Sequence, residues 1–330
     1  MAGNIGFNFG SSSAHLCPTL KPAVNFDPEG DCERMRKAMH GLGTDEAELI
    51  EVMAHRSAEQ RQILVQKYRS YYGKDLAAKF KSEISGHFYD TMEALCMTPA
   101  EFGASELYKA MKGAGTDESA IIEILCTRSN LELRQIKEAY GRLFSGANLE
   151  QDIAGDTSGD FKHICIALLQ ASRDECPSVD VTRARKDAED LYKAGEQKWG
   201  TEESKFIQVF VSRSHAHLQA VFAEYATLSQ KGIEGALKSE FSGWILEALL
   251  AIVACVNNPA LFFAEKLKYA MKGAGTDDRT LIRIIVSRCE VDMGAIKHEF
   301  HQLTGKSLES WVEGDTSGDY RRLLLALISG

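Results

Sequence analysis

Met111-Lys112-Gly113-Ala114-Gly115-Thr116-Asp117 is the stretch that reveals how the chain is organised, because versions of it occur four times. Two further copies run from Met39 to Asp45 and from Met271 to Asp277, and a diverged copy reads Gly195-Glu-Gln-Lys-Trp-Gly-Thr-Glu202. A carboxylate follows the last glycine of each copy at an almost constant distance along the chain. Four copies in register predict a repeated structural unit. The four acids are Glu83, Asp156, Glu240 and Asp315.

An amphipathic helix is predicted after each copy. An arginine always stands at the same distance after the last glycine, and apolar residues at i, i+1, i+3 and i+4 lie between them. In the second copy these are Ile121-Ile122 and Ile124-Leu125. Residues at this spacing share one broad face of an α-helix. The four arginines are Arg56, Arg128, Arg213 and Arg288.

The glycine-rich segments themselves are predicted to join two helices. Glycine commonly follows the end of a helix, and threonine is a good N-cap for the next one. An acid in the first helical turn also favours the positive end of the helix dipole. We therefore expect the N-caps to be the loop threonines, Thr44, Thr116, Thr201 and Thr276.

The fold class predicted from these patterns is all-α, with four or five helices in each repeat. The second and third loops are further apart than the other neighbouring loops, and the extra length lies near Pro177. No segment has the alternating pattern of a strand. We expect a flexible tail at 1–23, repeats at 24–96, 97–171, 183–255 and 256–330, and a linker at 172–182 that divides the chain into two halves.

Composition limits the function. The chain has 330 residues, is 44% apolar and 26% charged, and carries a net charge of −9. That charge argues against direct binding to nucleic acid or to an anionic membrane. The most apolar stretch, residues 244–256, is too short to cross a bilayer and contains Glu247, so it is predicted to be a buried helix. Eight cysteines without a C-x-x-C pair favour a reducing, cytoplasmic setting, and an extracellular role stays open.

The loops and the acids together suggest a metal site. Glycines allow several backbone carbonyls to point inward, and one carboxylate can complete an oxygen shell of the kind that suits Ca²⁺. A plain helix–helix turn would explain one loop, but it would not explain four acids at an almost constant distance from the loops along the chain. EF-hand, phosphate-loop, metalloprotease and dinucleotide-binding patterns fail on inspection. No catalytic set is visible, so we do not expect an enzyme.

The chain resembles the annexin family over roughly residues 24–330. The resemblance rests on the Gly-x-Gly-Thr-Asp/Glu loops, the repeat arginines and the two Gly-Asp-Thr-Ser-Gly-Asp segments at 155–160 and 314–319. It implies five-helix repeats arranged in two halves as a curved disc, with a variable N-terminal tail. It also implies Ca²⁺-dependent binding to anionic, phosphatidylserine-type membranes through loops on the convex face.

The resemblance carries the family's calcium ligands onto this sequence as backbone carbonyls and one acid per repeat. The third set departs from the family pattern, so its geometry is the least certain. The four sets are Met39, Gly41, Gly43 and Glu83; Met111, Gly113, Gly115 and Asp156; Gly195, Lys198, Gly200 and Glu240; and Met271, Gly273, Gly275 and Asp315.

Three loop side chains are candidates for lipid contact: Trp199, Lys112 and Lys272. A tryptophan folded back on a helix and simply solvated lysines are the alternatives. The repeat arginines are expected to satisfy helix C-terminal carbonyls. Family proposals of a pore map onto Glu106 and Arg128, but Gly103 lies where an acidic partner is often found.

The functional hypothesis is a peripheral, Ca²⁺-dependent membrane protein of the cytoplasm that acts in membrane organisation, vesicle traffic or repair. Self-association on membranes and a protein partner of the tail stay open. A calcium-independent helical scaffold and a cation channel are the competing hypotheses.

Overall fold

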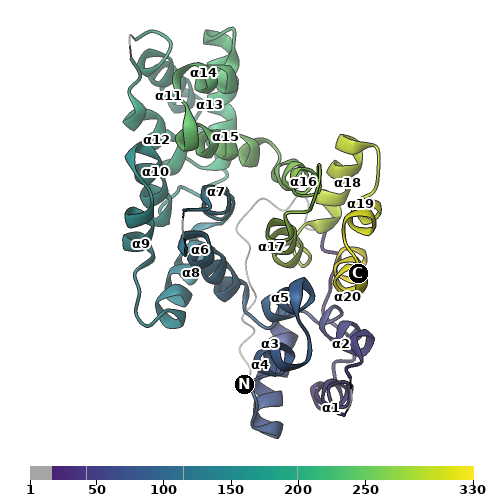
Figure 1. Ribbon diagram of the computed structural model, residues 1–330. Coiled ribbons are helices and arrows are strands. Elements are labelled where there is room, and N and C mark those ends of the chain that lie inside the picture. Colours follow the sequence, from purple (N-terminus) through teal and green to yellow (C-terminus); the bar gives the residue numbers. More distant parts are fainter. Residues whose placement is uncertain (1–16, 42, 114, 199) are drawn as a thin grey trace. The chain divides into compact units, whose positions relative to one another are not determined.

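The computed structural model describes residues 17–330 except 42, 114 and 199, and within this part every regular element is an α-helix. The prediction of an all-α fold is therefore confirmed. Each repeat holds five helices (Figure 1).

The helices of the first repeat are α1 (Pro28–Ala38), α2 (Glu46–Met53), α3 (Ala58–Tyr72), α4 (Leu76–Glu83) and α5 (Gly86–Leu95). Those of the second are α6 (Pro99–Met111), α7 (Glu118–Thr127), α8 (Asn130–Leu143), α9 (Leu149–Asp156) and α10 (Gly159–Leu169). Those of the third are α11 (Val181–Ala194), α12 (Glu203–Ser212), α13 (His215–Leu228), α14 (Gly232–Glu240) and α15 (Gly243–Asn257). Those of the fourth are α16 (Pro259–Ala270), α17 (Asp278–Arg288), α18 (Met293–Thr304), α19 (Leu308–Asp315) and α20 (Gly318–Ser329).

The chain forms two compact units, and their boundaries differ from the halves that the middle linker indicated. One unit contains Gly103–Pro259, which includes most of the second repeat, the linker near Pro177 and the third repeat. The other contains residues 17–102 and 260–330, which belong to the first and fourth repeats. The linker therefore lies inside a unit, because repeats 2 and 3 pack on each other.

Local signals set the ends of many helices. Ser57 and Gln60 form a reciprocal capping box at the start of α3, and Ser129 and Glu132 do the same at the start of α8. The third helix then ends at Gly73, whose φ of 63° lies in the left-handed region. Such caps satisfy the first and last backbone groups of a helix, which fixes where the chain turns.

In the unit that contains the second and third repeats, α7 packs against α15. The predicted apolar face of α7 is buried, with Ile121, Ile124 and Leu125 each at most 1% exposed. The long apolar helix α15 is a core helix, as predicted, although Trp244 at its N-terminal end is 44% exposed. None of the described helices is long and apolar enough to cross a bilayer.

In the other unit, α5, α17 and α20 pack against one another (Figure 1). The buried Arg61 ties the two repeats of this unit together. Its Nε donates to the carbonyl of Leu95 at 2.9 Å, and its Nη2 contacts Glu290 at 2.9 Å. The same Glu290 carboxylate caps α3 by accepting from the amide of Ala58 at 2.9 Å. One buried cation thus joins segments of the first and last repeats, which are far apart in sequence.

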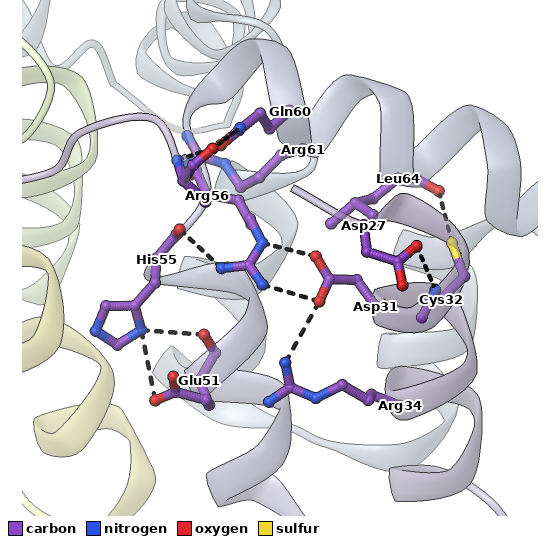
Figure 2. Close-up of polar contacts among 12 residues, drawn as sticks. Asp27, Asp31, Cys32, Arg34, Glu51, His55, Arg56, Gln60, Arg61 and Leu64 are labelled. Carbon is purple, nitrogen blue, oxygen red and sulfur yellow. Dashed lines mark hydrogen bonds and ion pairs between the residues drawn. The ribbon is translucent and has the colours of Figure 1, made fainter. Parts of the chain in front are cut away.

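Three of the repeat arginines, Arg56, Arg213 and Arg288, bind carboxylates, so the expectation that they mainly serve helix carbonyls is wrong for these three. Arg56 contacts both oxygens of Asp31, at 2.6 and 2.9 Å, and adds one bond to the carbonyl of His55 (Figure 2). Arg213 contacts both oxygens of Asp187 at 2.7 and 3.1 Å. A planar guanidinium matches a carboxylate with two parallel hydrogen bonds, and this geometry suits a mostly buried position better than single carbonyls.

The fourth arginine, Arg288, binds Asp292 at 2.6 and 2.8 Å, one turn further along the chain. In the second repeat, Gly103 packs closely against Ile136. A Cβ added there would lie 2.8 Å from Cδ1 of Ile136, so a larger residue requires the Ile136 side chain to shift. The neighbouring Glu106 is buried and pairs with Lys109 at 3.2 Å. The pore hypothesis thus gains no acidic partner at residue 103.

Candidate metal and membrane site

The glycine-rich loops take up the backbone conformation that only glycine adopts without strain. Seven loop glycines have φ between 83° and 122°. A residue with a Cβ is strained in this region, so these glycines are required by the path of the loop. The seven are Gly41, Gly43, Gly113, Gly115, Gly200, Gly273 and Gly275.

One backbone hydrogen bond closes each loop. The amide of Asp117 donates to the carbonyl of Ala110 at 2.8 Å, and that of Asp277 donates to the carbonyl of Ala270 at 2.8 Å. The equivalent bonds in the first and third repeats are from Asp45 to Ala38 and from Glu202 to Ala194, each at 2.9 Å. All four loops are therefore closed by a hydrogen bond between equivalent residues, one at the end of the preceding helix and one just before the next helix.

The N-cap residues differ from the prediction. Asp45, Asp117 and Asp277, one position after the threonines, are the N-caps, and their carboxylates accept from backbone amides of the first turn. In the third repeat Glu202 takes this position and makes no side-chain cap. Aspartate caps as well as threonine does, which releases the threonine hydroxyl for another partner.

That partner is the acid of the same repeat. The Thr201 hydroxyl donates to Oε2 of Glu240 at 2.6 Å. The Thr276 hydroxyl lies 3.2 Å from both the backbone oxygen and Oδ2 of Asp315. Thr116 donates to the backbone oxygen of Asp156 at 3.3 Å, and Thr44 bonds to the side chain of Glu83. The recurring sequence spacing therefore reflects a real contact in every repeat.

The acids occupy equivalent places in the fold. Each of Glu83, Asp156, Glu240 and Asp315 is the last residue of its helix, which is α4, α9, α14 or α19. The chain then turns through a serine into α5, α10, α15 or α20, and that serine makes no side-chain cap. The acids thus stand at helix ends beside the loops, while their role as metal ligands stays a prediction.

The third loop has a different geometry, as its sequence suggested. Gly195 has a ψ of −102°, whereas Met39 at the equivalent position of the first loop has a ψ of 18°. A Cβ added at Gly195 would lie 3.2 Å from Cζ of Phe206 and 3.5 Å from Cγ of Glu240. Its carbonyl already accepts a hydrogen bond from the amide of Lys198 at 2.8 Å. Glu196 is held by the Tyr225 hydroxyl at 3.0 Å. A cation would share the Gly195 carbonyl with an existing hydrogen bond.

The predicted lipid-contact lysines lie on the surface of their loops. The ammonium of Lys112 is 5.2 Å from the centre of the Tyr108 ring, and that of Lys272 is 5.9 Å from the centre of the Tyr269 ring. Both distances allow a cation–π contact. Trp199, the third predicted contact residue, lies outside the described residues.

Trp244 is a surface residue near the third loop that the sequence reading treated only as part of a buried helix. It closely follows Glu240 and lies in the first turn of α15, and 44% of it is exposed. Glu240 is bonded to Thr201, so the tryptophan and the loop meet at the same end of the repeat. The pattern Ser-Gly-Trp at a helix start, against Ser-Gly-His or Ser-Gly-Asp in the other repeats, was the available signal.

The donors present suit a hard cation. Within the described residues no three histidine, cysteine or acidic side chains are grouped to hold a metal ion. Each loop instead offers backbone carbonyls at positive-φ glycines, with one carboxylate beside them. Carbonyl and carboxylate oxygens are the ligands that Ca²⁺ takes, in flexible geometries that leave room for water. The residues present therefore fit Ca²⁺.

The fold and these loops define a class of helical proteins with four repeats and one oxygen-lined loop per repeat. The Annexin family model matches residues 30–95, 102–168, 186–252 and 262–327. Annexin A13 of Homo sapiens is 50% identical over 303 residues, which cover 92% of this chain and 96% of that protein. The chain therefore belongs to the annexin family.

Solved structures agree with this assignment. The structure of annexin III matches with a TM-score of 0.94 at 44% identity, covering 97% of this chain and 99% of that one. A calcium-bound annexin (Sm)1 matches with a TM-score of 0.86 at 32% identity, covering 98% and 95%. Annexins bind Ca²⁺ and phospholipid, and they are not typical enzymes, so Ca²⁺ is the cofactor expected from the family.

Proposed function

We propose that this protein binds anionic phospholipid membranes, of the phosphatidylserine type, through Ca²⁺ held at its loops. The observation that supports this most is the contact between a loop threonine and the acid of its repeat, which recurs four times. A helical scaffold with ordinary turns has no need for it. The ligands would be the four sets of carbonyls and acids predicted from the sequence.

The residues of each loop would have separate roles. Positive-φ glycines would let backbone carbonyls face the cation, and the backbone bond to the preceding helix would keep the loop closed. The threonine hydroxyl would hold the carboxylate in the first, third and fourth repeats and the backbone of the acid in the second. Bound Ca²⁺ would supply the positive charge that a chain of net charge −9 lacks toward an anionic leaflet. Few charged ligands imply weak affinity in the absence of lipid, roughly 10⁻⁵–10⁻³ M.

Aromatic and basic side chains near the loops would add contacts with the headgroups. Trp244, Trp199 and Tyr269 are amphipathic rings of the kind favoured at a membrane interface. Lys112 and Lys272 carry charges that suit lipid phosphate. Several weak sites acting on one surface bind more tightly than any of them alone.

The finer assignments belong to the same proposal. We propose the repeat boundaries given above, a cytoplasmic and membrane-peripheral location, and a role in membrane organisation, vesicle traffic or repair. Self-association on the membrane is part of this proposal, and the tail partner has no proposed identity.

Co-sedimentation with phosphatidylserine vesicles across a calcium titration, reversed by EGTA, tests the function. We expect the variant Glu83→Gln, Asp156→Asn, Glu240→Gln, Asp315→Asn to lose calcium-dependent binding, because each loop loses its only acidic ligand. A matched control neutralises one acid per repeat on helices outside the loops, at Glu59, Glu138, Glu234 and Glu265. Equal binding by both variants would favour the scaffold hypothesis.

A further inference from the structure

Among the residues that the structure describes, the acid of the first repeat has a lysine partner on its own helix, and the other three acids have none at the equivalent position. Lys79, one turn earlier on α4, forms a close ion pair with Oε1 of Glu83. The lysine side chain is 20% exposed and the glutamate side chain 21% exposed, so the pair lies partly shielded from solvent. Ser82 also lies within 3.4 Å of the same carboxylate oxygen.

The residue four positions before each acid differs among the repeats. It is Asp152 in the second repeat, Ala236 in the third and Trp311 in the fourth. Asp152 accepts a hydrogen bond from the Tyr140 hydroxyl at 2.7 Å and brings negative charge to its helix. Among the four described acids, only Glu83 has an ammonium group at this position.

A lysine here competes with a metal ion for the same oxygen atoms. The ammonium donates hydrogen bonds to the lone pairs that a cation would use, and its charge cancels that of the carboxylate. A cation at the first loop must therefore displace Lys79 or share Glu83 with it. The flexible four-carbon stem of lysine allows the group to swing away without movement of the helix.

We propose that Lys79 is a built-in competitor that lowers the calcium affinity of the first loop. The inference rests on the proposed function and concerns how one of its sites is regulated. With the lysine in place, the first loop would need more calcium to fill than it would without the lysine.

The size of the effect follows from the exposure of the pair. A partly exposed ion pair contributes little, and its removal corresponds to about a three- to fivefold change in affinity. The test uses the full chain with Asp156→Asn, Glu240→Gln and Asp315→Asn, in which Glu83 is the remaining acid of the four. Lys79→Gln is compared with Lys81→Gln, an exposed lysine on the same helix.

Isothermal titration with Ca²⁺ should show about three- to fivefold tighter binding for Lys79→Gln. Lys81→Gln should change the affinity less, because it alters only the long-range charge. Equal effects of the two substitutions would overturn the proposal. Calcium-dependent sedimentation of the unmutated chain, measured separately, distinguishes this result from failure of the membrane function.

A second measurement needs no calcium. In EGTA, an amine-acylating reagent followed by mass spectrometry should label Lys79 more slowly than Lys81, because Glu83 holds the Lys79 ammonium. The single substitution Glu83→Gln should raise the labelling of Lys79 severalfold and leave Lys81 unchanged. If Lys79 is labelled equally fast with and without Glu83, the ion pair is not formed in solution and the proposal fails.

Discussion

The substitution Asp187→Ala should destabilise the unit that contains the second and third repeats. The Asp187 carboxylate, on α11, accepts two hydrogen bonds from Arg213 at 2.7 and 3.1 Å. It also lies 3.0 Å from Nε2 of His217. Asp187 and His217 are each 5% exposed as whole residues, so removal of the acid leaves the buried His217 and the mostly buried Arg213 without this partner.

The expected loss in free energy of unfolding can be worked out from this geometry. Removing one member of a buried ion pair costs about 3–5 kcal/mol. The Arg213 side chain keeps 19% of its surface, so water can partly replace the carboxylate and the loss should lie near the lower limit. In a unit of this size, a loss of about 3 kcal/mol lowers the melting temperature by about 6–12 °C.

Urea unfolding followed by tryptophan fluorescence measures this loss. Trp244 belongs to the unit of Asp187, and Trp311 belongs to the other unit. The control is Arg185→Ala, which breaks an exposed pair with Glu224 and should leave the midpoint almost unchanged. A loss below about 1 kcal/mol for Asp187→Ala would refute the assignment of this cluster as a buried, mutually dependent unit.

The same cluster predicts a pH dependence. Burial raises the pKa of Asp187, but the hydrogen bonds from Arg213 and His217 outweigh burial, so the pKa in the folded protein is lowered. A lowered carboxyl pKa contributes stability above the unfolded value of about 3.9, and this stability is lost as pH falls through the folded value. The difference in stability between the unmutated protein and Asp187→Ala should therefore shrink below about pH 4.

Three further measurements check other parts of the structure. Gly275→Ala should strain the fourth loop by about 1 kcal/mol, because the φ of residue 275 is 95°. No atom lies near the added Cβ, so the strain comes from the backbone alone. Calcium titration should show weaker binding, with little change in melting temperature. Trp244→Ala should weaken vesicle binding severalfold, and equal sedimentation of both proteins would contradict an interfacial role. A thiol reagent should modify the exposed Cys17 and Cys176 quickly, and the six buried cysteines only after unfolding; fast reaction of a third thiol would contradict the packing.

Much of the fold follows from the sequence because its signals are local. The apolar faces of α2, α7, α12 and α17 repeat with helical spacing, and all four are buried as predicted. The ends of α3 also follow from local residues, since Ser57 and Gln60 cap its start and Gly73 ends it. Four copies of one pattern make the number of repeats predictable from residue order alone.

Local signals failed where two residues could serve the same role. Both threonine and aspartate are good N-caps, and only the folded loop shows that aspartate takes the cap while threonine contacts the distant acid. The arginines also have several possible acceptors in sequence. The carboxylates of Asp31 and Asp187 are selected because α1 and α11, which carry them, pack on the helices that precede the arginines. Asp292 is reached locally, because it follows Arg288 by four residues.

The sequence was enough to specify the helices and the loops, because these depend on near neighbours in the chain. It also singled out the acids Glu83, Asp156, Glu240 and Asp315, because their distance from the loops recurs in all four repeats. Three other features are visible only in the folded chain. Repeats 2 and 3 share one compact unit, Lys79 pairs with Glu83, and Trp244 is exposed. These features depend on which helix faces pack together and on where each side chain lies after folding. The close packing of the folded chain determines both the packing of the faces and the positions of the side chains.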